Sequence, residues 1–379
     1  MIPLSIWEKE SFFAPADIVI VGSGFVGLWS AWHLKRAHPS LSVTIVERGA
    51  IPTGASTRNA GFACFGSLTE LIADAKKMGE DKMLELVEMR YKGLRRIRKT
   101  FGDKTIDYKD HGGYELITGM TDMNELRTNI DWLNLRLKKI AKKQKAFRLQ
   151  DDRITSFGFA GVEHLVEARE EGQLHPGKLC QALLRLVQSM GVNVLTNLEI
   201  KSFERVNGQL VLETGREFSL KAGKLLICTN GFARQLLPQL DITPARGQVL
   251  VTSPIEGLPF SGSFHYDEGF YYFRDLGDRV LLGGARNLSI GTENTEEMTV
   301  TDMIQQALER MLRETILPGK DYTIEHRWSG IMGMGSDKQP LMQELGTGVF
   351  CAVRMSGMGV ALAPMIGRQI AEMMFGSQG

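Results

Sequence analysis

The sequence predicts an α/β protein organised around one β–α–β unit near its N-terminus. Residues 17–21 form an apolar run typical of a buried strand. Residues 22–27 follow with the pattern Gly-x-Gly-x-x-Gly and lead into a helical pattern. A second apolar run, residues 43–46, ends on Glu47. A strand, a glycine turn, a helix, a second strand and an acid, in this order, make up the dinucleotide-binding unit.

Each position in this unit has a physical task. Gly22 permits the tight turn, Gly24 lets the backbone approach a pyrophosphate, and Gly27 lets helix and strand pack closely. The helix start offers N–H groups and a partial positive charge to the phosphates. Glu47 lies 20 positions past Gly27, where a carboxylate accepts hydrogen bonds from ribose hydroxyls and repels a 2′-phosphate. The other expected contacts in the turn are Ser23, Phe25 and Val26.

The segment after Glu47 favours FAD over NAD. A plain NAD-binding domain would continue with another helix and strand, whereas residues 54–62 are small, polar and punctuated by glycine, with one cation. Such a segment suits a chain that runs beside a diphosphate and a flat ring. The expected contacts here are Arg48, Ser56, Thr57, Arg58, Asn59, Ala60 and Gly61.

The run Glu-Arg followed by Gly-Ala-Ser-x-Arg-Asn-Ala-Gly resembles the D-amino-acid-oxidase-like superfamily of FAD enzymes, which includes glycine oxidase, monomeric sarcosine oxidase and γ-glutamylputrescine oxidase. Residues 244–249 are close to the family's P-x-R-G-Q strand. Residues 328–364 are similar to its closing W-x-G…D-x-x-P and S-G-x-G-x-x-L-A-P motifs. The resemblance implies an FAD-binding Rossmann-like domain of glutathione-reductase type. It also implies an interleaved α+β substrate domain built on a mostly antiparallel sheet.

The resemblance also implies site residues and domain boundaries. The backbone at Ile200 is expected to meet the adenine ring, and Thr229, Asn230 and Gly231 to reach the cofactor. A glycine-rich turn is expected to aim N–H groups at the flavin pyrimidine oxygen; its residues are Gly357, Met358, Gly359, Val360 and Ala361. The expected FAD-binding domain comprises residues 1–80, 160–233 and 330–379, and the substrate domain residues 81–159 and 234–329. These segments must converge on one cofactor.

Apolar periodicity predicts the remaining elements. Helices are expected at residues 68–100 with Gly79 interrupting the pattern, 124–145, 178–190 and 301–316. Strands are expected at residues 112–119, 191–195, 199–203, 210–212, 217–220 and 224–228, and a hairpin at 265–274 and 279–284.

Composition narrows the class of protein. The chain has 379 residues, enough for two domains, and a net charge of +1, which gives no steering toward nucleic acid. No apolar run reaches the length of a membrane-spanning helix, and residues 1–15 lack the basic start of a secretory signal, so the expected location is cytoplasmic. The cysteines at 64, 180, 228 and 351 have no metal or disulfide spacing and are expected as buried thiols, although Cys64 follows the flavin-side segment.

The expected chemistry is oxidation of a C–N bond of an amine or amino-acid derivative. A hydride passes to flavin N5, the imine hydrolyses and O₂ takes the electrons. Alternatives are a dehydrogenase subunit that passes electrons to a partner protein or quinone, and a flavin-binding module without catalysis. Gly330 stands where sarcosine oxidase attaches its flavin through cysteine, so FAD is expected to bind non-covalently. The expected assembly is a monomer or small homo-oligomer.

Substrate contacts are expected on the strand of residues 270–274. Period-two alternation puts Tyr272 and Arg274 on one face, where they could anchor a carboxylate. The alternative is that Tyr272 belongs to the aromatic core and Arg274 lies at its rim. Arg354 is the other candidate clamp. Glycine oxidase carries arginines where this chain has Met332 and Gly357, so the standard grip on a small α-amino acid is not expected. The Trp328-x-Gly330 pattern looks more like γ-glutamylputrescine oxidase and favours an amine or longer derivative.

Overall fold

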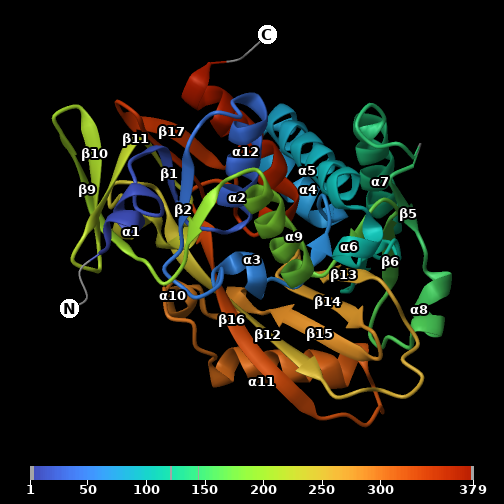
Figure 1. The fold of residues 1–379 in the computed structure, drawn as a ribbon. Helices are drawn as coiled ribbons and strands as arrows, with labels where there is room; N and C mark the ends of the chain where they lie inside the picture. The colour runs from blue at the N-terminus through green and yellow to red at the C-terminus, as the bar shows by residue number, and fades with distance from the viewer. Residues whose placement is uncertain (1–3, 120–121, 144, 377–379) are drawn as a thin grey trace. The chain divides into compact units, whose positions relative to one another are not determined.

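The computed structural model describes residues 4–119, 122–143 and 145–376. The chain divides into two compact units, each formed by separate stretches of sequence (Figure 1). Unit 1 comprises Met1–Thr57, Gly177–Pro244 and Met332–Gly379, and unit 2 comprises Arg58–Pro176 and Ala245–Ile331. Among the described residues, no helix combines the length and the apolar character needed to span a bilayer.

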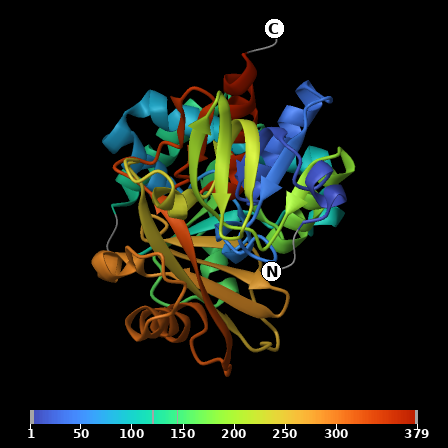
Figure 2. The same ribbon diagram turned by 60° about the vertical axis from the view of Figure 1, so that its left-hand side comes forward.

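Unit 1 is built on a sheet whose central strands are parallel. The sheet order is β17-β18-β11-β1-β2-β8, with the hairpin of β9 and β10 extending from β11. The strands are β1 (Ala16–Val21), β2 (Val43–Val46), β8 (Asn193–Leu195), β9 (Ile200–Val206), β10 (Gln209–Thr214), β11 (Ser219–Ile227), β17 (Leu341–Gly346) and β18 (Val349–Val353). The helical segments are α1 (Ile6–Glu10), α2 (Phe25–Ala37), α3 (Ala55–Arg58), α9 (Pro176–Ser189), η1 (Asn230–Gln235) and α12 (Gly359–Phe375). In Figures 1 and 2 the hairpin of β9 and β10 projects as a long ribbon.

Helices α2 and α12 pack against each other at a glycine. A Cβ atom at Gly367 of α12 would lie 2.8 Å from the backbone nitrogen of Ser30 and from the Cβ of Trp29 in α2. Trp29 is fully buried, as are Leu28 and Leu34 of the same helix. Burial of this kind stabilises the helix through tertiary packing, so α2 needs no strongly polar face.

Unit 2 is built on a mostly antiparallel sheet of order β16-β12-β15-β14-β13-β4-β6-β5. Its strands are β4 (Gly113–Ile117), β5 (Phe147–Leu149), β6 (His164–Ala168), β12 (Thr243–Thr252), β13 (Ser263–Tyr266), β14 (Tyr271–Leu276), β15 (Arg279–Gly284) and β16 (Ile324–Met334), with the small pair β3 (Phe62–Ala63) and β7 (Gly172–Gln173). Its helices are α4 (Leu68–Met78), α5 (Glu80–Phe101), α6 (Asp103–Ile106), α7 (Met123–Leu137), α8 (Asp152–Phe157), η2 (Arg286–Ser289), α10 (Ile290–Glu293), α11 (Asp302–Met311) and η3 (Leu312–Ile316).

The two faces of this sheet have different partners. Phe264 and Phe273 stack with ring centroids 4.6 Å apart in a core that also includes Leu308 of α11. Figure 1 shows α11 running across this side of the sheet. Tyr272 lies in a different apolar cluster, with Val249 of β12. The period-two prediction for residues 270–274 is therefore confirmed, and so is the α/β fold with a mostly antiparallel second sheet.

Four predicted elements differ from the structure. The helix expected at 124–145 ends at Leu137, because the N–H groups of Lys142 and Lys143 bond to Tyr91 and Glu170 and not to the preceding turn. Of this range, residue 144 lies outside the described residues. The strands expected at 217–220 and 224–228 form one continuous strand, β11. The strand expected at 265–274 is two antiparallel strands, since Asp267 and Glu268 take left-handed conformations between them.

The compact units also differ in extent from the expected domains. Residues 58–80 and 160–176, expected with the nucleotide-binding unit, fall in unit 2. The pairing of β3 with β7 and the packing of Leu68 and Leu71 against Phe147 and Val166 hold these residues there. The assignment of FAD to one of these units stays a prediction. Of the expected FAD-binding domain, residues 1–3 and 377–379 lie outside the described residues.

Candidate cofactor site

Four parallel strands of unit 1 end at one edge of its sheet. Strands β2, β1, β11 and β18 lie side by side and run in the same direction. Each leads into a segment singled out in the sequence: Glu47 after β2, Gly22 after β1, Thr229 after β11 and Arg354 after β18. Open α/β sheets bind ligands outside the carboxyl ends of their strands. The structure therefore brings the distant segments of unit 1 to the edge where a cofactor is expected.

The glycine turn is close-packed. Gly22 has a φ of 105°, a conformation that residues with a side chain rarely adopt. A Cβ atom on Gly27 would lie 2.1 Å from the carbonyl oxygen of Gly22. Gly24 caps the start of α2 without a side-chain hydrogen bond, and a Cβ there would lie 2.9 Å from Oγ of Ser56. Backbone N–H groups in the first turn of α2 have no partners within the helix and are suited to phosphates.

Glu47 is tied to this turn by its carboxylate. Its Oε2 accepts hydrogen bonds from the N–H of Ser23 at 3.1 Å and from the Ser23 hydroxyl at 2.8 Å. Its Oε1 accepts from the N–H of Gly49 at 2.9 Å. These contacts fix the acid at the tip of β2, next to the glycine turn. The neighbouring Arg48 places its guanidinium 4.1 Å from the ring centroid of Phe232.

The side chain of Asn230 organises the turn after β18. Its Oδ1 accepts hydrogen bonds from the N–H groups of Arg354 at 3.1 Å and of Met355 at 3.2 Å. Arg354 and Ser356 both have positive φ values, 64° and 48°, and Gly357 follows at 83°. Non-glycine residues held in the left-handed region concentrate at functional sites, where the surrounding structure compensates the cost.

Two buried hydroxyls at this edge have no partner. Oγ1 of Thr229 and Oγ of Ser356 are both buried and lack a hydrogen-bond partner among the described residues. Buried polar atoms in proteins are nearly always satisfied by a protein group, water or ligand. Met358, which caps α12, makes no side-chain cap, so the N–H groups at Gly359, Val360 and Ala361 begin a helix open to an acceptor. These groups fit a polar cofactor with carbonyl and phosphate oxygens.

The remaining predicted contacts of unit 1 border the same edge. Ile200 is buried where β9 begins, and the N–H of Leu198 just before it bonds to the carbonyl of Glu47 at 3.0 Å. Oγ of Ser56 accepts the N–H of Phe25 at 2.9 Å, and the Thr57 hydroxyl donates to the Pro52 carbonyl. Gly231 is buried in the short helix η1.

The continuation of the flavin-side segment is anchored within unit 2. Nη1 of Arg58 donates to the carbonyl of Ser329 at 2.9 Å, and Nε1 of Trp328 donates to the carbonyl of Arg58 at 3.0 Å. Oδ1 of Asn59 accepts the N–H of Gly61 at 2.9 Å. The W-x-G motif and the Arg-Asn motif are therefore in direct contact.

Arg274 also holds this segment. Its Nη1 donates to the carbonyls of Ala60, Gly61 and Leu174 at 3.3, 3.1 and 2.9 Å, and its Nε donates to Asp275. Burial lowers the pKa of Arg274 to about 10, so the group is still charged at neutral pH. A substrate carboxylate would have to compete with three backbone carbonyls for this guanidinium. The contacts give Arg274 a structural role.

Arg354 is similarly engaged in unit 1. Its Nη1 and Nη2 form ion pairs with Asp241 at 2.7 Å and Asp337 at 2.8 Å, and its Nε donates to the carbonyl of Gln339. Arg354 was predicted as a substrate clamp from the sequence. The two aspartates that pair with it lie 113 and 17 positions away, so the pattern around Arg354 does not indicate them. Its guanidinium is committed to fixing the turn after β18.

Tyr272 has a different environment. Its ring lies over Gly283 of β15, where a Cβ atom would be 2.5 Å from Cε2 of the ring. It belongs to an apolar cluster with Val249, Val251, Leu281, Ala60 and Trp328. Burial raises the pKa of Tyr272 to about 12, so its hydroxyl stays protonated.

A buried polar cluster in unit 2 was not predicted from the sequence. Nε2 of His265 lies 3.7 Å from Oε2 of Glu171, whose Oε1 accepts the N–H groups of Phe65 and Gly66. Although burial lowers the pKa of His265, contacts with Cys64 and Glu171 raise it well above its ordinary value. Burial raises the pKa of the Cys64 thiol. Only the position of Cys64 after the flavin-side motif hinted at this cluster.

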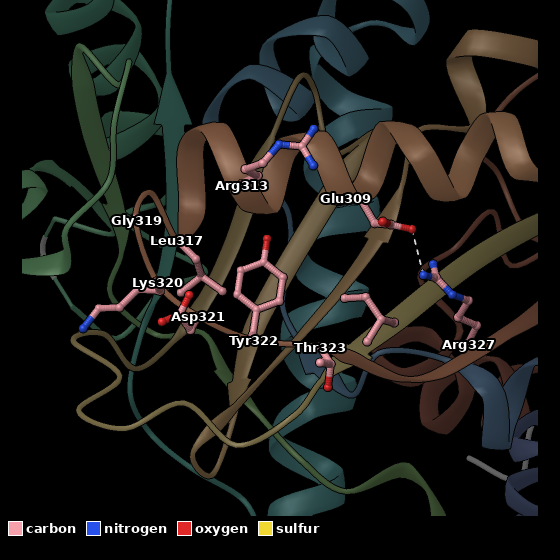
Figure 3. Close-up of a pocket in the computed structure, with 10 residues that line it drawn as sticks. Glu309, Arg313, Leu317, Gly319, Lys320, Asp321, Tyr322, Thr323 and Arg327 are labelled. Atoms are coloured by element: carbon pink, nitrogen blue, oxygen red, sulfur yellow. Dashed lines mark hydrogen bonds and ion pairs between the residues drawn. The ribbon is translucent and has the colours of Figure 1, made fainter.

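A cavity of about 620 Å³ lies beside α11 in unit 2 (Figure 3). Arg313, Tyr322 and the ion pair of Glu309 with Arg327 are among its lining residues, all between 309 and 327. None of the residues singled out in the sequence lines it, and it is open to solvent. The chemistry suggested by the motifs therefore lies elsewhere in the chain.

Comparison with known proteins agrees with the motifs. The family model of the FAD-dependent oxidoreductases called DAO matches residues 17–373. The chain is 25% identical to the probable oxidoreductase OrdL of Rhizobium meliloti, covering 95% of this chain and 83% of the relative. It is 24% identical to the γ-glutamylputrescine oxidoreductase of Escherichia coli, covering 95% and 84%. Glycine oxidase from Geobacillus kaustophilus has a similar structure, with a TM-score of 0.77 at 18% identity and 96% coverage of both chains.

The family match spans nearly the whole chain, and the structural likeness supports the same fold. The resemblance seen in the motifs is thereby confirmed, and the protein is an FAD-dependent oxidoreductase whose relatives act on amino acids or amines. The chain belongs to the DAO family of FAD-dependent oxidoreductases.

Proposed function

We propose that this protein oxidises a C–N bond of an amine or amino-acid derivative, with non-covalently bound FAD and with O₂ as the electron acceptor. The observation that carries the proposal is the convergence of Gly22, Glu47, Thr229 and Arg354 at the carboxyl ends of four parallel strands. Beside them lie the unpartnered hydroxyls of Thr229 and Ser356. The family supplies the identity of the cofactor.

The residues of unit 1 divide the task of holding FAD. The glycine turn and the start of α2 receive the diphosphate, and Glu47 receives the ribose hydroxyls. The N–H groups at the start of α12, with the hydroxyl of Ser356, receive the oxygen atoms of the flavin ring. When bound, FAD supplies a two-electron oxidant for the C–N bond.

The non-covalent mode is supported by the surroundings of Gly330. Glycine has no side chain that could form a covalent bond to a flavin, and a Cβ atom at this position would lie 3.0 Å from Cβ of Arg58. Acid denaturation of the yellow protein should release free FAD into the supernatant. Flavin that stays with the precipitated chain would contradict this part of the proposal.

The central experiment is anaerobic reduction of the bound flavin. The purified protein is loaded with FAD and mixed with primary amines, secondary amines, D- and L-amino acids, their derivatives and hydroxy acids. We expect loss of the visible flavin absorbance with compounds that carry a C–H bond next to nitrogen. A preparation that takes up no FAD, or one bleached by hydroxy acids alone, would contradict the proposal.

The electron acceptor is tested in the same preparation. Aerobic turnover with stoichiometric H₂O₂ supports an oxidase. Turnover that needs a dye or quinone, with no peroxide, would favour the alternative of a dehydrogenase that passes electrons to another protein. A flavin that no compound bleaches would favour a binding module without catalysis.

A further inference from the structure

A glutamate and a histidine face each other in the interior of unit 2. Nε2 of His265 lies 3.7 Å from Oε2 of Glu171, and the two side chains are 8% and 0% exposed. Neither atom has a hydrogen-bond partner among the described residues. A carboxylate removed from water needs a cation or hydrogen-bond donors to compensate its charge. The imidazole of His265 supplies that positive charge to Glu171 only while it is protonated.

The other oxygen of Glu171 holds the backbone that continues the flavin-side segment, residues 54–62. Oε1 accepts hydrogen bonds from the N–H groups of Phe65 at 2.8 Å and of Gly66 at 3.1 Å. Strand β3, just before them, pairs with β7, which begins one residue after Glu171. The N–H of Leu174 bonds to the carbonyl of Gly61 at 2.8 Å. Residues 61–66 are therefore tied to residues 171–174 at both ends.

The sheet bounds the Glu171 carboxylate on its other side. A Cβ atom at Gly113 of β4 would lie 2.2 Å from Oε2, so the carboxylate lies directly against the backbone of this strand. The ring of His265 contacts Phe62 edge-on, with ring centroids 5.1 Å apart and planes at 89°. A change in the charge of the pair therefore acts directly on residues 62–66.

His265 is the member of its surroundings that titrates. The titratable and charged groups that face it from the neighbouring elements are Glu171, Cys64, Glu115 of β4, Tyr272 of β14, and Glu70 of α4 with its partner Arg90 of α5. Glu115 already accepts hydrogen bonds from the start of α4, and burial raises the pKa of Tyr272 to about 12. Although burial lowers the pKa of His265, contacts with Cys64 and Glu171 raise it well above its ordinary value of about 6.5.

We propose that Glu171 and His265 together position the flavin-side segment, and that FAD is held more weakly once His265 has lost its proton. The inference rests on the FAD site of the proposed function and adds two positioning residues that act on it through the chain. Loss of the proton leaves the buried carboxylate beside a neutral ring, which weakens its hold on the N–H groups of Phe65 and Gly66. Because residues 61–66 directly continue the segment that contains Ser56 and Asn59, the change reaches the expected cofactor contacts.

The first arm of the test measures the dissociation constant of FAD on apoprotein from pH 6 to pH 9. We expect the affinity of the wild type to fall about 10-fold over this range. His265→Gln and Glu171→Gln should show no such decline, because each removes one charge of the pair while Gln at position 171 keeps an acceptor oxygen. A merely structural role would lower the affinity of both variants at every pH and leave the decline in place.

His164→Gln is the matched control in unit 2. Nδ1 of His164 pairs with Oδ2 of Asp151 at 2.9 Å, and the other oxygen of Asp151 accepts the N–H of Leu165 at 2.8 Å. The pair thus has the same design as Glu171 with His265 but no contact with the flavin-side segment among the hydrogen bonds and ion pairs of the described residues. Its variant should follow the wild-type curve.

The second arm uses the wild type alone, so it decides the matter even if the variants do not fold. If the proton of His265 favours FAD, then FAD must favour the proton, and binding should take up protons as the pH approaches the pKa of His265. Calorimetry in buffers of different ionisation enthalpy measures this uptake.

The possible results separate this inference from the proposed function. A wild-type affinity that is constant from pH 6 to pH 9 without proton uptake overturns the inference, as does a decline that both variants retain. In either case, flavin bleaching by amines would leave the proposed function standing. A protein that takes up no FAD at any pH overturns the proposed function and this inference with it.

Discussion

The carbonyl oxygen of Gly22 lies 2.1 Å from the point where residue 27 would carry a Cβ atom. Even an alanine methyl group at position 27 would collide with a backbone atom, and a backbone atom at the end of β1 cannot move without disturbing the sheet. The close approach therefore fixes glycine at position 27.

Gly27→Ala should destabilise the protein by about 1–3 kcal/mol, the usual cost of overpacking, and weaken FAD binding. Urea unfolding of the apoprotein and fluorescence titration with FAD measure the two effects. Gly54→Ala is the matched control, because a Cβ atom at Gly54 meets no atom within 4 Å. Equal stability of the two variants would show that the turn relaxes more easily than the geometry indicates.

Asn230→Ala should weaken FAD binding by loosening the turn after β18. The substitution leaves the N–H groups of Arg354 and Met355 without their acceptor, at a cost of about 1–3 kcal/mol. Asn230→Asp keeps an acceptor oxygen and should retain most of the affinity. The dissociation constant of FAD, measured on apoprotein, separates the two variants. An Asp variant as weak as the Ala variant would argue against the hydrogen bonds as the cause.

Arg274→Met should reduce stability and leave substrate preference unchanged. The carbonyls of Ala60, Gly61 and Leu174 each lose a charged donor, so the free energy of unfolding should fall by about 1.5–3 kcal/mol. The ratio of kcat/KM for carboxylated and plain amine substrates should stay at the wild-type value. A selective loss of the carboxylated substrates would return Arg274 to the role of substrate clamp.

His265 should make stability depend on pH. Its pKa in the folded protein is raised by Cys64 and Glu171, so its protonated form stabilises the fold below its ordinary pKa of about 6.5. That contribution is lost as the pH rises through the higher folded value. Facing charges on neighbouring elements are Glu171 and Glu115. Urea unfolding of the wild type from pH 6 to 9 should show a decline that His265→Gln lacks. Parallel curves would rule out this contribution.

The local features of the fold could be predicted from the sequence, because they depend on residues near one another. The β–α–β unit and the glycine turn follow from period and spacing alone. The interruption at Gly79 between α4 and α5 was also predicted. By contrast, the end of α7 at Leu137 depends on Tyr91 and Glu170, which accept the N–H groups of the residues after it. Periodicity in a window of sequence carries no information about such distant acceptors.

The same limit applies to the candidate site. Arg274 and Arg354 looked like clamps because arginines near a flavin motif are suited to carboxylates. Their actual partners come from segments far away in sequence, such as Leu174 and Asp241.

The position of β18 has a consequence for biosynthesis. Residues 349–353 insert beside β11, and β11 in turn lies beside β1 from the start of the chain. A nascent polypeptide on the ribosome cannot complete the sheet of unit 1 until residues 349–353 have been translated. Such long-range pairing slows folding and leaves strand edges exposed in the meantime. A chain stopped before residue 349 should therefore depend on chaperones or aggregate, even though its entire glycine turn has been made.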